Sequence, residues 1–407
     1  MPVELPLGDG TVSVSLPSCD VTVLEPPGGD PVDVPEAARE AVADPHGLPL
    51  AGQVGSDDDV AIVVTDATRS SPDDVLLDAL VAELERTGVD REQISVVAGL
   101  GLHRPMTDDE FEDALGEYAP LAENSDPEAT VEVGTVEDVP IEIYETVAEA
   151  DAVLATGTVE PHQYAGFSAG AKTVVVGAGG ESQIGYTHGP DLLSRDGVRL
   201  GQVEGNPFRE FVEAAGDVVG IDFVLNVGRG LDGFVDAAAG EPRAVVRDLA
   251  ESARDALATE VDDEYDVVVS GLGAPKGNQL YQTTRGATYV VLGANNPLKA
   301  GGRVVVPARL TEGAGEGTGE RRFYDWLSNA TDADELYEEM LEGYEPGAQR
   351  AFVTAQTLRR AEMYVTNSEH PEVAEECLMH ARDTVEDAVP EGSDVLVLPD
   401  AHNTLLV

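Results

Sequence analysis

The sequence predicts an α/β protein with two domains, each a mostly parallel sheet flanked by helices. Short β-branched runs alternate along the chain with helical stretches, and no internal repeat interrupts the pattern. The length of 407 residues exceeds what one ordinary core supports. We place the N-terminal domain at residues 1–262 and the C-terminal domain at 263–392. A strand within 393–407 could return to the first domain, and we expect the ligand site in the cleft between the domains.

The N-terminal domain is expected to contain five strands and two long helices. The strands are predicted at residues 60–65, 94–98, 151–156, 173–177 and 222–227. The helices are predicted at 71–87 and 241–260. In the first helix, Ser71 is the expected N-cap, Pro72 the first helical residue, and Asp73 and Asp74 lie in the first turn.

The C-terminal domain is expected to form a second α/β unit. Strands are predicted at 266–270, 303–307 and 394–398, and helices at 281–294, 346–361 and 371–385. The Gly-rich stretch 311–319 is interpreted as a mobile loop and a candidate lid.

The charge balance is extreme and excludes several partners. The chain has 78 acidic against 24 basic side chains, a net charge of −54, and only three lysines. Such a surface repels nucleic acid and anionic lipid, and its even spread predicts adaptation to high salt. With no apolar run of about 18 residues and no signal peptide, a cytoplasmic location without membrane contact is expected. Cys19 and Cys377 are interpreted as small buried hydrophobic residues.

Three histidines are candidate site residues because Gly-rich loops place each of them just after a predicted strand. These are His103, His162 and His188. Strand ends are where open α/β sheets bind ligands. Any one alone is more simply a loop histidine with a local hydrogen bond, whereas three together indicate a site. The other histidines lack this context, so they receive no role: His46, His370, His380 and His402.

Two further features point to an anionic ligand. Lys172 lies among small residues before a predicted buried strand, where its amine suits covalent attachment or, alternatively, an ion pair. Asp66 and Arg69 lie between a strand and a helix start, where a guanidinium can grip a carboxylate. The residues alone therefore indicate an α/β enzyme acting on an anionic substrate. A metal hydrolase is the alternative, although the chain lacks His-Glu-x-x-His, Gly-x-Ser-x-Gly and phosphate-loop motifs.

At this point the sequence resembles the nickel-dependent lactate racemase family. The resemblance spans most of the chain and is densest at residues 66–72, 99–107, 157–189 and 271–286. Its most specific part is His-Gln-Tyr-Ala-Gly-Phe-Ser-Ala-Gly-Ala-Lys, residues 162–172, followed by His188 sixteen residues later. The resemblance implies a racemase or epimerase of a small 2-hydroxy acid.

The resemblance also implies a cofactor and residue roles. The cofactor is the nickel-pincer nucleotide, pyridinium-3-thioamide-5-thiocarboxylic acid mononucleotide, which would be attached to Lys172 with His188 as the protein ligand to nickel. His103 and His162 look like alternating acid/base residues during hydride transfer. Arg69 resembles the substrate-orienting guanidinium and Asp66 a cofactor-pocket residue. Tyr281 resembles a cofactor contact, and Gln282 and Arg285 resemble substrate contacts.

Two departures put the identity of the substrate in doubt. Arg285 stands where lactate-specific members carry Lys, and Ala348 stands near their Trp. The alternative is a non-racemising member, either a 2-hydroxyacid oxidoreductase-like enzyme or a cofactor- or ligand-binding protein. Cofactor biosynthesis enzymes would be needed for activation, and the sequence leaves the oligomeric state unknown.

Overall fold

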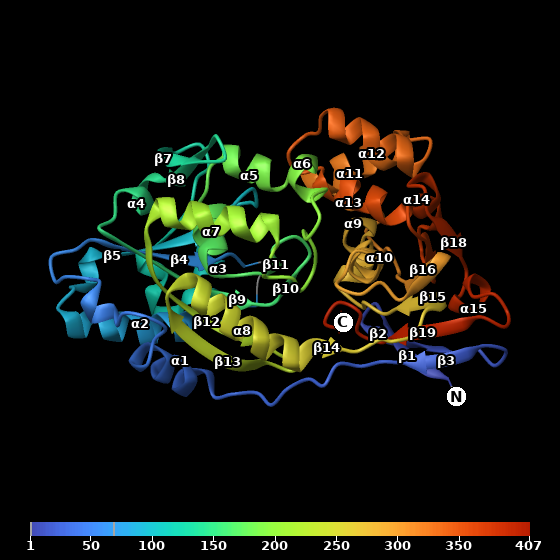
Figure 1. The fold of residues 1–407 in the computed structure, drawn as a ribbon, viewed down its shortest axis with the longest axis horizontal. Coiled ribbons are helices and arrows are strands. Elements are labelled where there is room, and N and C mark those ends of the chain that lie inside the picture. Colours follow the sequence, from blue (N-terminus) through green and yellow to red (C-terminus); the bar gives the residue numbers. More distant parts are fainter. Residues whose placement is uncertain (1, 68–69) are drawn as a thin grey trace. The chain divides into compact units, whose positions relative to one another are not determined.

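The computed structural model describes residues 2–67 and 70–407 and forms two compact units, whose elements are labelled in Figure 1. The middle unit comprises Gly28–His188 and Arg195–Ala256. The terminal unit contains both ends of the chain and comprises Met1–Pro27, Gly189–Ser194 and Leu257–Val407. The predicted class, α/β with mostly parallel sheets flanked by helices, is confirmed.

The middle unit is built on a six-stranded sheet. In spatial order its strands are β13 (Phe234–Gly240), β12 (Ile221–Arg229), β9 (Ala152–Val159), β4 (Val60–Thr65), β5 (Ile94–Gly99) and β6 (Ala122–Asn124). All neighbours are parallel except the β12–β13 hairpin. Both faces are covered, so strands such as β4 are continuous apolar runs, and Ile62 and Val63 are fully buried.

Helices and small hairpins surround this sheet. The helices are α1 (Val34–Ala43), α2 (Asp73–Thr87), α3 (Asp108–Leu115), α4 (Glu145–Ala148), α5 (Glu181–Thr187), α7 (Pro207–Val219) and α8 (Pro242–Leu257). Shorter helical turns are η1 (Leu50–Gly52), η2 (Arg91–Gln93), η3 (Gly116–Leu121) and η4 (Thr173–Gly177). The hairpins pair β7 (Thr130–Val136) with β8 (Val139–Tyr144) and β10 (Pro161–His162) with β11 (Gly166–Phe167).

The expected strand at 173–177 is wrong, because η4 is a π-helical turn. A short buried apolar run does not distinguish a strand from a buried helix by periodicity. The backbone of η4 lies close to the end of β5, since a Cβ added to Gly177 would lie 3.0 Å from the Cα of Gly99. In α2, the N-cap is Pro72 rather than Ser71, although Asp73 and Asp74 do occupy the first turn.

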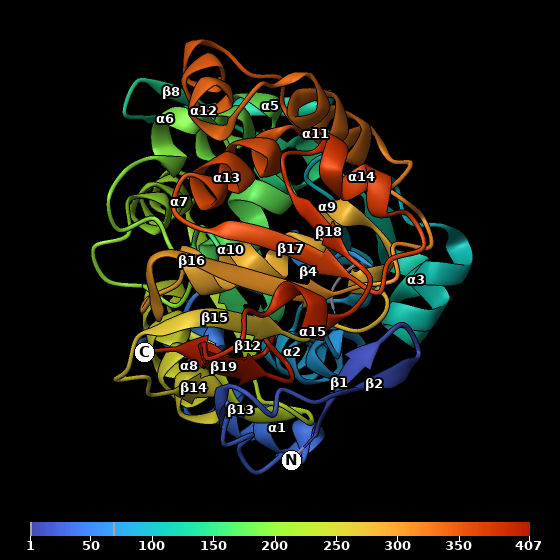
Figure 2. The ribbon, with the colours of Figure 1, turned by 90° about the vertical axis from the view of Figure 1, so that its right-hand side faces the viewer.

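The terminal unit has a six-stranded sheet that is parallel throughout (Figure 2). Its order is β18 (His380–Arg382), β17 (Glu362–Thr366), β16 (Leu298–Pro307), β15 (Tyr265–Ser270), β19 (Asp394–Leu398) and β3 (Asp20–Val23). Beside it, β1 (Val3–Leu7) pairs with β2 (Gly10–Val14), and β14 (Ala258–Thr259) with β20 (Leu405–Leu406). The helical elements are α6 (Pro190–Leu193), η5 (Lys276–Asn278), α9 (Leu280–Thr283), α10 (Arg285–Val291), α11 (Thr318–Asn329), α12 (Ala333–Glu342), α13 (Gln349–Leu358), α14 (Pro371–Glu376) and α15 (Val385–Ala388).

Residues 393–407 pair with strands from both predicted ranges: β19 with β15 and β3, and β20 with β14. Two expectations for this part of the chain need correction. The predicted helix 281–294 is divided into α9 and α10. The predicted helix 371–385 is instead α14 followed by β18, because the helix ends at Cys377 and the chain then joins the sheet edge.

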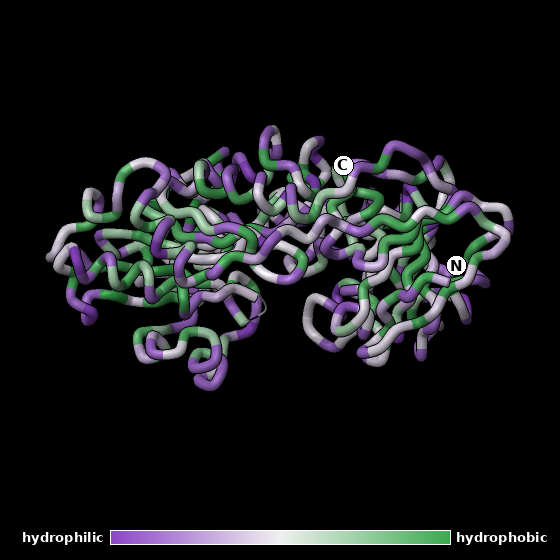
Figure 3. The backbone as a smooth tube through the Cα atoms, turned by 90° about the horizontal axis from the view of Figure 1, so that it is seen from below, coloured by the Kyte–Doolittle hydropathy of each residue, from purple (hydrophilic) through white to green (hydrophobic). Residues whose placement is uncertain are grey.

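Hydrophobic segments, green in Figure 3, concentrate in the interior strands of each unit, and hydrophilic segments follow the outer loops and helices. The terminal unit buries a cluster that includes Val267, Val305 and Val397. Neither cysteine forms a disulfide; Cys377 is buried, whereas Cys19 is only half-buried. Across residues 2–67 and 70–407, no helix has the length and apolarity needed to span a bilayer.

Candidate active site

His103 forms a close pair with Asp66. Strands β4 and β5 are parallel neighbours, so their carboxyl ends bring together Asp66, which follows β4, and the loop that carries His103. His103 Nδ1 lies 2.5 Å from Asp66 Oδ2. Because a carboxylate only accepts hydrogen bonds, we assign a proton to Nδ1, so in the neutral ring Nε2 carries the lone pair. Asp66 is buried, whereas 52% of the His103 side chain is exposed.

His162 has the opposite proton arrangement. Its Nδ1 accepts hydrogen bonds from the backbone N–H groups of Tyr164 at 3.3 Å and Ala165 at 3.2 Å. An accepting Nδ1 is unprotonated, so the neutral ring carries its proton on Nε2. This histidine therefore presents a hydrogen-bond donor where His103 presents an acceptor.

His188 lies at the C-terminal end of α5, not after a strand as predicted. Its Nδ1 is 3.1 Å from the carbonyl oxygen of Ile184, to which it donates, so Nε2 keeps the lone pair. Burial lowers the pKa of His188 to about 4, and the positive charge of Lys172 lowers it further. A neutral imidazole with Nδ1 held by a carbonyl is the form that binds metal through Nε2.

Two of these histidines belong to one aromatic cluster. The ring of Tyr164 lies 5.7 Å from that of His162 and 5.8 Å from that of His188. The ring of Phe208 lies 6.3 Å and 5.6 Å from the same two histidines. Tyr164 and Phe208 are buried, so they fix the separation of the two imidazoles.

Lys172 ends a tight segment that begins at His162. The backbone of Ala169 has φ 62° and that of Gly170 has φ 61°, which turns the chain into the short helical region that contains Lys172. A positive φ is unfavourable for alanine, so packing must hold this conformation. Since the charge of Lys172 reaches His188, the structure brings these two predicted residues together.

Arg69 lies outside the described residues. The helix that follows it is anchored by Asp73, which is buried and accepts hydrogen bonds from Thr65 at 2.8 Å, Ser71 at 2.9 Å and Thr156 at 2.6 Å. Burial raises the pKa of Asp73, and the three hydroxyl donors oppose that rise. The segment that leads from β4 into α2 is thus fixed at its far end.

The remaining predicted residues lie in the terminal unit. Arg285 Nε donates to Gln282 Oε1 at 2.7 Å, and its Nη1 donates to the Tyr289 hydroxyl at 3.0 Å. The Tyr281 ring packs edge-on against Phe323 at 5.5 Å, and the guanidinium carbon of Arg350 lies 5.2 Å from its centroid. Gln282 and Arg285 therefore act as one pair, and Tyr281 is held from two sides.

Several residues of these environments escaped the sequence analysis. Tyr289 supports Arg285 and stacks on His402 at 5.2 Å, and Arg350 is fully buried next to Ala348 in the chain. Helix α7, with Asn206, Phe208 and Arg209, was also missed. The Asn206-Pro207 pair is an N-cap followed by proline at the first helical position, with Gly220 as the left-handed C-cap, and this signal could have found it.

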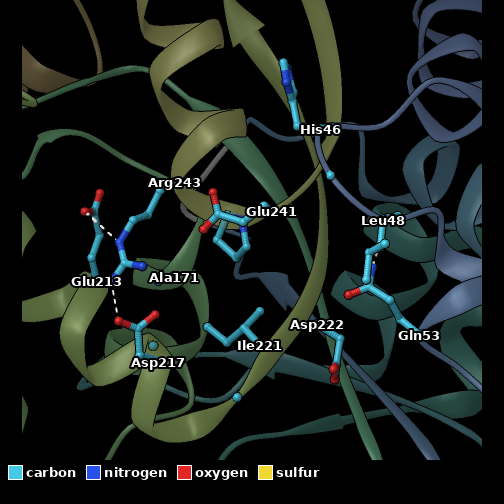
Figure 4. A pocket seen from close by; sticks show the side chains of 14 residues that line it. His46, Leu48, Gln53, Ala171, Glu213, Asp217, Ile221, Asp222, Glu241 and Arg243 are labelled. Atoms are coloured by element: carbon cyan, nitrogen blue, oxygen red, sulfur yellow. Dashed lines mark hydrogen bonds and ion pairs between the residues drawn. The ribbon is translucent and has the colours of Figure 1, made fainter.

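A pocket of about 460 Å³ lies elsewhere in the middle unit (Figure 4). Its lining includes four acidic side chains, and Arg243 within it pairs with two of them, Glu213 and Asp217. None of the predicted site residues lines it, although Ala171 precedes Lys172. The pocket offers no constellation of acid, base and nucleophile, so we place the candidate site at the histidines.

The donor set at His188 limits how a metal could be held. Within the described part of the chain, no group of three or more His, Cys, Asp or Glu side chains is arranged to bind a metal ion. His188 offers a single nitrogen in the metal-binding tautomer, with an amine nearby at Lys172. These residues fit a metal that arrives with its other ligands on an organic group attached to Lys172.

Comparison with known proteins points to lactate racemases. Residues 7–201 match the model of the lactate racemase N-terminal domain. The lactate racemase of Thermoanaerobacterium thermosaccharolyticum is 24% identical over 434 residues, which cover 99% of each chain. The lactate racemase of Lactiplantibacillus plantarum is 24% identical over 290 residues, which cover 69% of this chain and 66% of its own. The solved lactate racemase apoprotein of the first organism superimposes with a TM-score of 0.88 at 21% identity, over the whole of both chains. A protein from Thermotoga maritima superimposes with a TM-score of 0.67 at 17% sequence identity, covering 94% of this chain and 99% of its own.

Fold and site together define an α/β protein of two units whose N-terminal half carries a lactate racemase N-terminal domain. Over its whole length the chain is similar to a lactate racemase in sequence and in fold.

Proposed function

We propose that this chain is an isomerase that racemises or epimerises a small 2-hydroxy acid, with a nickel-pincer nucleotide attached covalently to Lys172. The observation that carries the proposal is a pair of histidines held in opposite ways at Nδ1: His103 Nδ1 faces the Asp66 carboxylate, whereas His162 Nδ1 accepts two backbone N–H groups. A 2-hydroxy acid and its keto form need an acceptor and a donor at the substrate oxygen. The names of the relatives support lactate as a substrate.

Lys172 would hold the cofactor by its amine, and His188 Nε2 would bind the metal. Asp66 and Tyr281 are further candidates for cofactor contacts. When bound, the group supplies an electron sink that accepts the α-hydrogen with its electron pair and returns it to the opposite face. The chain itself supplies placement and proton movement.

His103 Nε2 accepts the hydroxyl proton of the enantiomer whose oxygen faces it, and Asp66 stabilises the resulting imidazolium. His162 Nε2–H donates a hydrogen bond to the oxygen on the other side and polarises the carbonyl. His162 can release its Nε2 proton completely only if Nδ1 takes up another proton. The hydrogen bonds from the N–H groups of Tyr164 and Ala165 to Nδ1 must first break. The two histidines thus share the reaction without being equivalent in the resting enzyme.

Substrate selection would fall to guanidinium groups. Arg69 would orient the substrate carboxylate, and Arg285, fixed by Gln282 and Tyr289, would bind a second polar group in two-pronged fashion. Ala348 replaces a bulky side chain, so the enzyme would accept substrates longer than lactate. The oxidoreductase-like alternative differs in releasing the keto acid.

The direct test combines composition with chirality. Protein co-produced with cofactor biosynthesis enzymes is analysed by intact mass and metal content, then incubated with single enantiomers of lactate and longer 2-hydroxy acids, and the products are separated by chiral chromatography. The proposal expects one added nucleotide mass, nickel and appearance of the opposite enantiomer, all lost in Lys172→Ala. Unmodified protein under these conditions, or keto acid without the opposite enantiomer, would refute it.

We further propose that the protein works in the cytoplasm at high salt, where ions screen the self-repulsion of its −54 charge. Unfolding transitions measured from low to high KCl test this, because stability is expected to rise steeply with salt. A stability independent of salt would refute the adaptation.

A further inference from the structure

Helix α7 lies along the segment that joins His162 to Lys172. A Cβ added to Gly166 would lie 1.8 Å from the carbonyl oxygen of Gln202, just before α7. One added to Gly216, near the other end of α7, would lie 2.7 Å from Cβ of Ala171. The two chains therefore approach closely at both glycines, and α7 lies along this segment.

The main link between them is Arg209, whose side chain is 1% exposed. Its Nε donates to the carbonyl of Ala165 at 3.2 Å, its Nη1 to that of Ala169 at 3.4 Å, and its Nη2 to that of Phe167. These are alternate residues, and their carbonyls all point toward the one guanidinium. The rigid guanidinium fork thus pairs with the segment as a neighbouring strand would.

Such a residue is costly, which argues for a specific role. Taking a guanidinium out of water is unfavourable unless its N–H groups are satisfied in good geometry. Here the hydrogen bonds go to carbonyls that lie in an irregular segment, including Ala169 with its positive φ. An apolar side chain could fill the same space but could not hold those carbonyls in place.

The first turn of α7 adds two contacts. Asn206 Nδ2 donates to the carbonyl of Tyr164 at 2.8 Å, while its Oδ1 caps the helix by accepting from the N–H groups of Phe208 and Arg209. The Phe208 ring packs against both His162 and His188. Asn206, Phe208 and Arg209 therefore all touch the segment or its histidines.

We infer that the first turn of α7 sets the position of His162 and its proton arrangement, with Arg209 as the main positioning residue and Asn206 as the second. Arg209 holds residues 165–169, and this segment directs the N–H groups of Tyr164 and Ala165 at His162 Nδ1. The part of this inference that concerns turnover rests on the proposed function; the part that concerns geometry does not.

The test uses folded apoprotein, so it needs neither cofactor nor substrate. Hydrogen–deuterium exchange of the peptide covering residues 160–172 is compared among wild type, Arg209→Lys and Arg209→Met. We expect exchange at least ~10-fold faster in Arg209→Met and an intermediate rate in Arg209→Lys, which supplies one charged donor in place of the fork. In parallel, ¹⁵N spectra should show His162 changing from the Nε2–H form to a mixture of forms.

Two further variants separate positioning from stability. Asn206→Asp keeps the acceptor that caps α7 but cannot donate to Tyr164, so it should loosen residues 160–172 without unfolding the helix. Arg91→Met is the control for removing a guanidinium, because Arg91 pairs with Glu117 and packs on Tyr118 in the same unit, away from this segment.

The positioning role is overturned if Arg209→Met folds with unchanged exchange and an unchanged His162 tautomer. It is also overturned if Arg91→Met loosens residues 160–172 equally. In loaded enzyme, Arg209→Lys should lower kcat by up to ~100-fold with KM little changed, as expected for misplacement. Absence of any racemase activity in wild type would refute the proposed function while leaving the exchange and tautomer results to decide this inference.

Discussion

The surroundings of His103 and His162 differ in almost every respect. His103 lies in an exposed loop and donates from Nδ1 to the buried carboxylate of Asp66. His162 lies in a half-buried hairpin, accepts two backbone N–H groups at Nδ1 and packs among aromatic rings. Nδ1 therefore faces an acceptor at the first position and two donors at the second.

This difference shows that neighbouring groups alone can give two histidines complementary hydrogen-bonding roles. The resemblance in sequence implied an interchangeable acid/base pair. In the resting structure, His103 offers a base and His162 a hydrogen-bond donor. The predictions below test that asymmetry, from the largest expected effect to the smallest.

Glutamine substitutions at positions 103 and 162 should lower kcat by different factors. The amide N–H of Gln can take the place of an Nε2–H donor but cannot act as a base. His103→Gln should therefore lower kcat for racemisation by about 10²- to 10⁴-fold, and His162→Gln by a smaller factor. Steady-state kinetics on the loaded enzyme measures both. His46→Gln is the control, since His46 pairs with Asp248 at the surface, and equal losses at 103 and 162 would contradict the asymmetry.

His188 extends the comparison through pH. Its folded pKa of about 4 lies below the ordinary 6.5, so between these values the unfolded chain binds more protons than the folded one. The free energy of unfolding of the apoprotein should fall as the pH drops from 6.5 to 4, by about 3 kcal/mol from this group. Denaturant unfolding of wild type and His188→Gln at high salt measures the difference. Parallel pH profiles for the two proteins would argue against a neutral His188.

Asp66→Asn tests whether the charge of Asp66 contributes to the role of His103. The amide oxygen can still accept from Nδ1, so the tautomer is kept while the charge that stabilises the imidazolium is lost. We expect kcat to fall about 10- to 100-fold, with KM less affected. Wild-type kcat in this variant would mean that His103 does not become charged during turnover.

The smallest effect is expected at Arg104, the neighbour of His103. Arg104 pairs with Glu110 and holds the pKa of that carboxyl at about 2, but the pair is exposed to solvent. Arg104→Ala should leave kcat within about two-fold and should hardly change stability, because solvent screens the exposed pair. A large loss of activity would show that the surface charge, and not Asp66, governs His103.

Strands and motif residues were predictable wherever local pattern decides structure. Apolar runs predicted the strands β4 and β5. The ends of these neighbouring strands lead into the segments that carry Asp66 and His103. The three histidines and Lys172 could be selected as candidates because they stand out in Gly-rich contexts of a Lys-poor chain, and their roles stay predictions. Their proton arrangements were not predictable, because these depend on partners such as the N–H groups of Tyr164 and Ala165 in folded geometry.

Two misses have tertiary causes. The run at 173–177 favours a strand locally, yet it forms a π-helical turn in close backbone contact with Gly99. Arg209 looks like an ordinary surface residue on an amphipathic helix, and only the placement of residues 165–169 beside α7 shows that it is buried. In both cases distant segments decide the outcome, and sequence periodicity carries no information about them.

The most direct test of the asymmetry is ¹⁵N NMR of the histidine rings at neutral pH and high salt, with His103→Gln and His162→Gln used to assign the signals. The structure predicts that His103 carries its proton on Nδ1 and His162 on Nε2. Finding the same tautomer at both positions, or a protonated His162 in the resting enzyme, would contradict the account.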